Sequence, residues 1–143
     1  MNSPGKSKKE RKPSLQHVRL HHWMMNTAAW QSLNAIEQSF YVQIARRYNG
    51  TNNGRIAFGC RDAENALKVG RRAALRARAV LQDRGFIVAT RTGAFRLKGR
   101  HSTEWRLTEF RCDITGAPAT TDFMRWRAQV IPLPVRRVGR EYG

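Results

Sequence analysis

The spacing of apolar residues in this chain changes at Gly85. Before that glycine, apolar side chains such as Phe40 and Ile44 recur every three or four residues, which is the repeat of an amphipathic helix. After it, apolar side chains such as Trp105 and Leu107 alternate with polar ones, which is the repeat of a strand with one buried face. A chain with helices first and strands second is expected to fold in the α+β class.

A first helix is predicted over residues 35–48. Asn34 and Glu37 have the spacing of a capping box, in which the amide side chain accepts from an early backbone N–H and the carboxylate reaches back. Asn49-Gly50 and Asn53-Gly54 follow at once, and both pairs tolerate positive φ. A tight loop is therefore expected from residue 48 to residue 54.

Two further helices are predicted over residues 60–68 and 71–84, after a short strand at 55–58. Gly70 separates the two helices, and Gly85 is a natural residue for the left-handed cap of the second one. The three helices together provide the apolar stripes of a small helical core.

A two-stranded ribbon is predicted from residues 86–91 and 103–108, with a basic tip between them. Residues 122–126 have the pattern of a short helical piece that packs back on the domain. Residues 15–31 carry enough apolar side chains to dock on the core, but their spacing leaves a strand and a short helix equally open.

The charge of the chain is strongly positive. Its 143 residues contain 27 Lys and Arg against 10 Asp and Glu, for a formal net charge of +17 and a pI near 11.5, while 41% of the residues are hydrophobic. The apolar share suffices for a modest core. Because the excess charge repels itself, a polyanionic partner is expected, nucleic acid before an anionic membrane surface.

The chain divides into three parts. Residues 1–14 have no aliphatic side chain after Met1 and are expected to form a flexible basic arm. Residues 15–126 are expected to form the folded domain with extensions on both sides. Residues 127–143, with two prolines and several arginines, are expected to form a second basic tail.

Several classes of protein are disfavoured by what the sequence lacks. It has no apolar run of the length that spans a membrane, and its basic N-terminus is not followed by the apolar stretch of a secretion signal. Cys60 and Cys112 form no disulfide or zinc pattern, and a reducing cytoplasm is the simplest expectation. His17 and His21 would share a face only if that segment were helical. Carboxylates are dispersed, so we expect no catalytic site, no metal and no cofactor.

The order helix, short strand, helix, turn, helix and ribbon over residues 34–108 resembles the winged helix-turn-helix family of DNA-binding domains. Its most specific stretches run from Asp62-Ala63 through Leu67-x-Val69-Gly70 to Ala74, and then over Leu81-Gln82-Asp83-Arg84-Gly85-Phe86-Ile87. They are similar to the helices and first wing strand of bacterial winged-helix regulators. The same order occurs in the winged domains of plasmid and phage replication initiators. Residues 46–56 are similar to uncharacterised helix-turn-helix proteins of bacterial chromosomes and mobile elements.

The resemblance implies a winged helix-turn-helix with a three-helix core, a short strand and a two-stranded wing. In that family the helix that matches residues 71–84 enters the major groove, and the ribbon contacts phosphates or the minor groove. The chain departs from the family at two positions. Lys68 occupies a turn position where glycine is common, and Gly70 occupies one where Ser or Thr is common.

The spacing of residues along the third helix also predicts a buried face and an outward face. On a helical wheel Ala74, Ala77 and Leu81 cluster within about 60° and form a core stripe. The groove-facing set, with guanidinium groups that can bind guanine edges or phosphates, is then Arg71, Arg72, Leu75 and Arg76.

The ribbon and the arms supply the remaining candidate contacts. Three basic residues at alternate positions of the ribbon are expected to lie on one face and to contact phosphates. They are Arg96, Lys98 and Arg100. An edge strand protected from aggregation by charge is the alternative interpretation of that pattern. The arms add non-specific contacts from Lys8, Lys9, Arg11, Lys12, Arg136 and Arg137.

The leading expectation is a DNA-binding protein of a bacterium or mobile element that is not an enzyme, regulates transcription and lies on the nucleoid. Double-stranded DNA is the expected partner, and a homodimer is left open. One alternative is an accessory factor of plasmid or phage replication or recombination. Another is a protein-interaction module in which Trp23, Trp30 and residues 109–126 form the contact.

Overall fold

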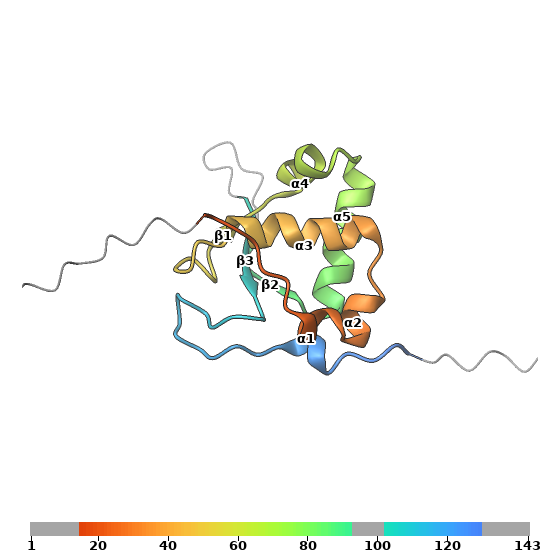
Figure 1. Ribbon diagram of the computed structural model, residues 1–143. Coiled ribbons are helices and arrows are strands. Elements are labelled where there is room, and N and C mark those ends of the chain that lie inside the picture. The colour runs from red at the N-terminus through yellow and green to blue at the C-terminus, as the bar shows by residue number, and fades with distance from the viewer. Residues whose placement is uncertain (1–14, 93–101, 130–143) are drawn as a thin grey trace, which may run out of the picture.

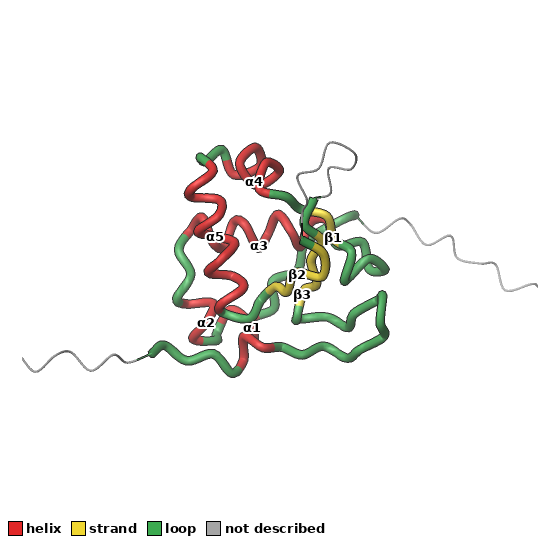
Figure 2. Tube along the Cα trace, turned by 180° about the vertical axis from the view of Figure 1, so that it is seen from behind, coloured by secondary structure: helices red, strands yellow, loops and turns green. Residues whose placement is uncertain are grey.

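Three helices form the centre of the molecule, for which the computed structural model describes residues 15–92 and 102–129. They are α3 (Ala35–Arg47), α4 (Cys60–Leu67) and α5 (Arg71–Asp83), and each packs against the other two. All three predicted helices are confirmed, and each ends one residue earlier than expected. Two opposite views place α4 and the start of α5 at one end of the molecule (Figure 1, Figure 2).

Local sequence signals set the ends of these helices. The predicted capping box of α3 is present, with Asn34 N donating to Glu37 Oε1 at 3.0 Å and Glu37 N donating to Asn34 Oδ1 at 2.9 Å. At the start of α4, Gly59 N donates to Asp62 Oδ2 at 2.9 Å. Both acidic groups therefore lie at the positive end of a helix dipole, where a carboxylate is stabilising.

A small antiparallel sheet completes the α+β fold. It contains β1 (Ile56–Ala57), β2 (Ile87–Arg91) and β3 (Glu104–Leu107), in the order β1-β3-β2. Ile56 pairs with Trp105, Ile87 pairs with Leu107, and all four side chains are buried. The alternation predicted for the ribbon is confirmed in β3, where Trp105 and Leu107 are buried and their neighbours are half-buried. It is wrong for β2, where Val88 and Ala89 are both half-buried and the pairing shifts between Ala89 and Arg91.

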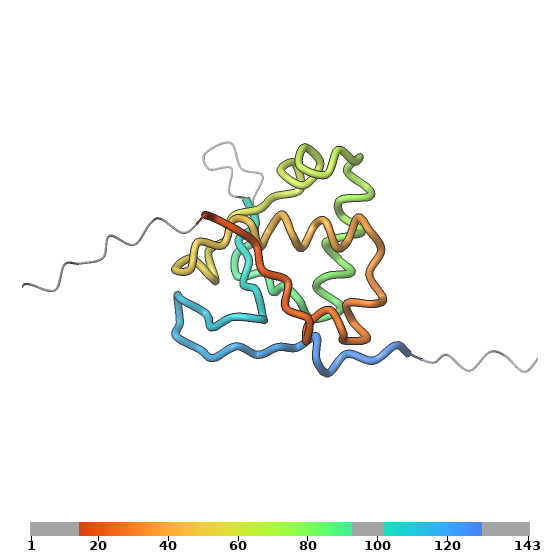
Figure 3. Tube along the Cα trace, in the orientation of Figure 1, coloured from red at the N-terminus to blue at the C-terminus, as the bar shows by residue number. Residues whose placement is uncertain are grey.

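The N-terminal segment, whose type was left open, forms two short helices. These are α1 (His22–Met25) and α2 (Ala28–Gln31), and Thr27 caps the second by accepting from Trp30 N at 3.1 Å. The predicted helical piece near the C-terminal end is a single turn, η1 (Asp122–Met124), which packs against α2. Figure 3 shows the first described segment running past β1 to α1, and the last one passing the same short helices.

Buried aromatic rings join these elements. Phe86 directly follows Gly85 and lies edge-on to Trp30 at 5.8 Å and to Tyr41 at 5.6 Å, measured between ring centroids. It also stacks on Phe123 of η1 at 4.9 Å. Gly85 has φ of +84°, and a Cβ atom there would lie 2.7 Å from the Cβ of Asp122. The turn after α5 therefore accepts only glycine, for conformation and for space.

The buried Glu109 side chain ties the segment after β3 to the helices. Glu109, after β3, lies with Oε2 2.7 Å from the Tyr41 hydroxyl and with Oε1 2.6 Å from His21 Nδ1. Burial, and then the Glu109 charge, raises the pKa of Tyr41 well above its ordinary value, so the tyrosine stays a neutral donor. This contact fixes the segment after β3 to α3 and to the start of α1.

Asn53 holds the loop before β1 against the end of β3. Its side chain is fully buried, accepts from Leu107 N at 2.7 Å and donates to Leu107 O at 3.0 Å and to Arg111 O at 2.8 Å. Its backbone N and O also bond to Asp113, each at 2.8 Å. The Asn53 side-chain amide thus supplies hydrogen bonds that backbone groups at the end of β3 would otherwise receive from a neighbouring strand.

We expect Asn53→Ala to lower the free energy of unfolding by about 2–4 kcal/mol, because it leaves buried backbone groups of Leu107 and Arg111 without partners. Urea denaturation followed by circular dichroism measures the change. Asn65→Ala is the control, because Asn65 is exposed on α4 and makes no hydrogen bond within the described part. A loss for Asn53→Ala no larger than that of the control would contradict the role assigned to Asn53.

Candidate nucleic-acid interface

The two faces of α5 have opposite chemistry. Ala74, Ala77 and Leu81 are buried against the core, as the helical wheel predicts. On the other side Arg72 and Arg76 are exposed. The small alanines let α5 lie close to its neighbouring helices, and the arginines are carried on a face that cannot rotate inward.

The structure brings the four predicted residues of α5 together on this outer surface. Arg71 is exposed beside Arg72, and the side chain of Leu75 is half-buried one turn further on, next to Arg76. Their spacing along the helix places all four within its first two turns. We call Arg71, Arg72, Leu75 and Arg76 the α5 face.

The arginines of the α5 face have no partner in the described part of the chain. None of their guanidinium groups forms a hydrogen bond or an ion pair there, and the same holds for the side chain of Arg78, which is half-buried on the flank. Arg61 and Arg91, which the sequence analysis did not single out, are also exposed, on α4 and at the end of β2. The only sequence signal for these two was the excess of basic residues in their segments.

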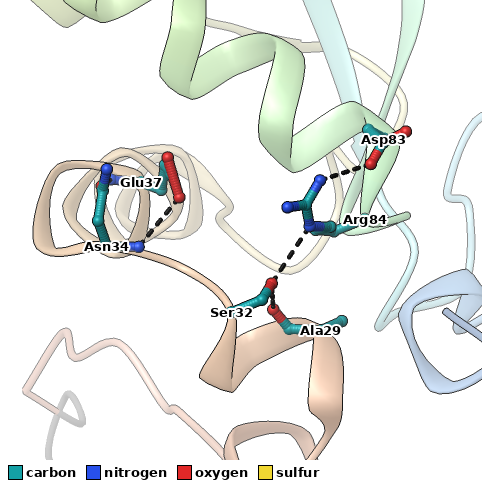
Figure 4. Close-up of polar contacts among 6 residues, drawn as sticks. All are labelled: Ala29, Ser32, Asn34, Glu37, Asp83 and Arg84. Atoms are coloured by element: carbon teal, nitrogen blue, oxygen red, sulfur yellow. Dashed lines mark hydrogen bonds and ion pairs between the residues drawn. The ribbon is translucent and has the colours of Figure 1, made fainter. Parts of the chain in front are cut away.

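Ion pairs occur instead at the other end of the molecule. The three between described residues are Arg84 with Asp83, Arg125 with Asp122, and the close His21–Glu109 contact. Arg84 also donates to Ser32 Oγ at 3.2 Å (Figure 4). Its guanidinium lies 4.5 Å from the ring centroid of Trp126. Arg84, the C-cap of α5, is thus engaged by neighbouring side chains and is not part of the α5 face.

The turn between α4 and α5 has an unusual backbone. Lys68 is exposed and left-handed, with φ of 55° and ψ of 46°, at the position where the resemblance implied glycine. Gly70 precedes α5, and no side chain caps that helix there; a Cβ atom at Gly70 would meet nothing within 4 Å. The first N–H groups of α5 are therefore open to a ligand from outside.

The first turn of α5 also lacks the acidic residue that α3 and α4 have. Glu37 and Asp62 occupy the first turns of those helices, whereas Arg71 and Arg72 occupy that of α5. Cations at the positive end of a helix dipole are unfavourable by a few tenths of a kcal/mol or more each. An anion bound at this end would remove that cost and use the open N–H groups.

The described ends of the β2–β3 hairpin lie beside the start of α4. Phe58 N donates to Thr103 O at 2.9 Å, and Trp105 Nε1 donates to Phe58 O at 2.8 Å. A Cβ atom at Gly59 would lie 3.4 Å from Ser102 Oγ. The described ends of β2 and β3 therefore lie at the end of the molecule that carries α4.

The remaining predicted contacts lie outside the described residues. These are, in the ribbon, Arg96, Lys98 and Arg100, and, in the arms, Lys8, Lys9, Arg11, Lys12, Arg136 and Arg137. They stay predictions. So do the flexible character of residues 1–14 and the boundary at residue 127.

Other candidate sites of the sequence analysis change in the structure. His17 lies in an irregular segment before α1, so it shares no helical face with His21. No group of three His, Cys, Asp or Glu side chains that could hold a metal ion occurs in residues 15–92 and 102–129. Trp30 is 5% exposed and so does not belong to a protein-contact surface, whereas Trp23 is 44% exposed. Within these ranges no helix has the length and apolar character to cross a membrane.

Comparisons with models of protein families, with curated protein sequences and with solved structures gave no match for this chain. The geometry of the interface is therefore interpreted from the chain's own residues.

The left-handed Lys68 gives a testable consequence. Lys68→Gly should raise the free energy of unfolding by about 0.5–1 kcal/mol, because glycine adopts this conformation without the steric cost of a Cβ atom. Thermal and urea unfolding measure it. Lys68→Ala is the matched control, because it removes the same charge but keeps the Cβ atom. Equal effects of the two substitutions would mean that charge, and not backbone conformation, sets the cost at this turn.

Proposed function

We propose that this chain is a winged helix-turn-helix protein that binds double-stranded DNA and regulates transcription. Here α4, the Lys68 turn and α5 are the helix-turn-helix, and β2 and β3 lead into the wing. The proposal is carried by one observation: the first two turns of α5 present exposed, unpaired arginines while the opposite face of the helix is buried. Such a helix can bind a polyanion through its exposed face only.

The dimensions of α5 suit the major groove of B-form DNA. A helix with its side chains is about 10–12 Å across, and that groove is about 12 Å wide. Ala73 is half-buried and Ala79 is exposed beside the α5 face, so small side chains let the helix backbone approach the bases. The deep and narrow major groove of A-form RNA does not admit a helix in this way, which favours DNA over RNA.

The other basic residues fit the same proposal as phosphate contacts. Arg61 on α4 and Arg91 at the end of β2 are exposed. Arg96, Lys98 and Arg100 of the wing would bind phosphates beside them, and the basic residues of the two arms would add affinity that is independent of sequence. Base edges would then be read by α5 alone.

A role in transcription is proposed ahead of one in replication or recombination. The two roles use the same interface and differ in where the bound sites lie. Mapping of bound fragments in the genome of origin tests the choice: sites upstream of coding regions support regulation, whereas sites confined to a replication origin or an attachment site contradict it.

Binding should depend steeply on salt. If the interface neutralises about 6–10 phosphates, affinity for a duplex should fall by ~10³–10⁵ between 50 and 200 mM salt, because bound counterions are released. Fluorescence anisotropy with a labelled duplex at several salt concentrations measures the slope. An affinity that hardly changes over this range would contradict the electrostatic interface.

Substitutions on α5 and on the wing should act differently. Arg76→Ala should cost ~1–3 kcal/mol on a selected site and relax sequence preference, because it removes a base contact. Lys98→Ala should weaken binding to all duplexes about equally, because it removes a phosphate contact. Affinities for the selected site and for random DNA measure both. Equal losses for the two variants on both duplexes would show that the contacts are assigned wrongly.

A further inference from the structure

The outer surface of α5 contains no hydrogen-bond acceptor side chain over its first eleven residues. Residues 71–81 consist only of arginine, alanine, leucine and valine. The first side chains that can accept are Gln82 and Asp83, at the end of the helix, and Asp83 is engaged by Arg84. The side chains of residues 71–81 can therefore contact a ligand only through guanidinium donors and apolar groups.

Base edges in the major groove differ in what they offer such a helix. Guanine presents two acceptors, O6 and N7, which a guanidinium can bind with two hydrogen bonds. Adenine presents a single acceptor, N7, beside an amino group, so a guanidinium can make one hydrogen bond there but not two. Cytosine presents only an amino group, which needs an acceptor that residues 71–81 do not have. Thymine presents a methyl group, which an apolar side chain such as Leu75 can contact.

The placement of the α5 face limits the reading to a few base pairs. Arg72 and Arg76 are one turn apart, about 6 Å along the helix axis, which is close to two steps of about 3.4 Å in DNA. Leu75 is half-buried next to Arg76. The far end of α5 is held by the contacts of Arg84 with Ser32 and Asp83, so the charge of Arg84 is paired there and is not free for a phosphate (Figure 4).

We propose that the α5 face selects DNA through guanine edges: Arg72 and Arg76 bind two guanines within about three base pairs of each other, and Leu75 contacts the methyl group of a thymine beside them. Adenine, with one acceptor, and cytosine, with none, do not replace either guanine in the reading by α5. This inference rests on the proposed function, because it assigns the chemistry that the same interface recognises.

Base analogues in a selected duplex test the inference. The full chain is first used to select duplexes from a random pool at a stated salt concentration, and the enriched site is then resynthesised. 7-Deazaguanine, which lacks the N7 acceptor, should lower affinity about 5- to 100-fold at each of two guanines. Deoxyuridine, which lacks the methyl group, should lower it about 2- to 4-fold at one thymine. 7-Deazaadenine at any adenine should change affinity less than twofold.

Lysine substitutions give the protein side of the test. Arg72→Lys and Arg76→Lys keep the charge but lose the two-pronged guanidinium, so each should abolish the effect of one 7-deazaguanine and leave the salt slope unchanged. Arg111→Lys is the matched control, because Arg111 is exposed in the loop after β3 and away from α5. It should behave like the wild type in every duplex.

The outcomes separate this inference from the proposed function. Salt-dependent duplex binding that Arg76→Ala weakens, but that 7-deazaguanine leaves unchanged, overturns guanine reading alone. So does a 7-deazaadenine effect as large as that of 7-deazaguanine, or a pool without any enriched site. Failure of the wild-type chain to bind duplex DNA, or equal binding by Arg76→Ala and wild type, overturns the proposed function itself.

Discussion

The packing of Phe86 against Trp30, Tyr41 and Phe123 is the contact on which the placement of α5 depends. Phe86 lies two residues after Arg84, the C-cap of α5, and the turn between them accepts only glycine, at Gly85. Its ring contacts Trp30, Tyr41 and Phe123. Large aromatic rings supply most of the buried area in so small a core and pack in fixed geometries. Since they hold the C-terminal end of α5 to α2, α3 and η1, the N-terminal half of the helix is carried outward as a rigid extension of that cluster.

Near the aromatic cluster the charged side chains of the described residues form ion pairs, whereas those of the α5 face do not. The ion pairs between described residues lie near α1, η1 and the end of α5, where Arg84, Arg125 and His21 meet carboxylates. The α5 face has no such partner in those ranges. The described ion pairs thus lie where the chain packs against itself, whereas the arginines of the α5 face keep unpaired charges that attract a polyanion.

Sequence patterns identified the elements whose signals are local. The capping pair Asn34 and Glu37, the left-handed Gly85 and the 3.6-residue spacing of Ala74, Ala77 and Leu81 each depend on neighbours within a turn or two, so the helices and the α5 face were predictable. Asn53, Glu109 and Arg84 could not be assigned in this way. Their partners lie about 50 residues or more away in sequence, and a polar side chain carries no periodic signal of the amide, hydroxyl or ring that it will meet.

The first turn of α5 links stability to the proposed function. Arg71 and Arg72 lie at the positive end of the helix dipole, and Arg72 and Arg76 repel each other one turn apart; each effect costs the free chain a few tenths of a kcal/mol or more. The left-handed Lys68 adds backbone strain beside them. Folding alone would favour an acidic first turn, such as α3 and α4 have, and a glycine at the turn. A phosphate backbone at this end would reverse the sign of the electrostatic terms, so the features that weaken the free helix are those that would strengthen its complex with DNA.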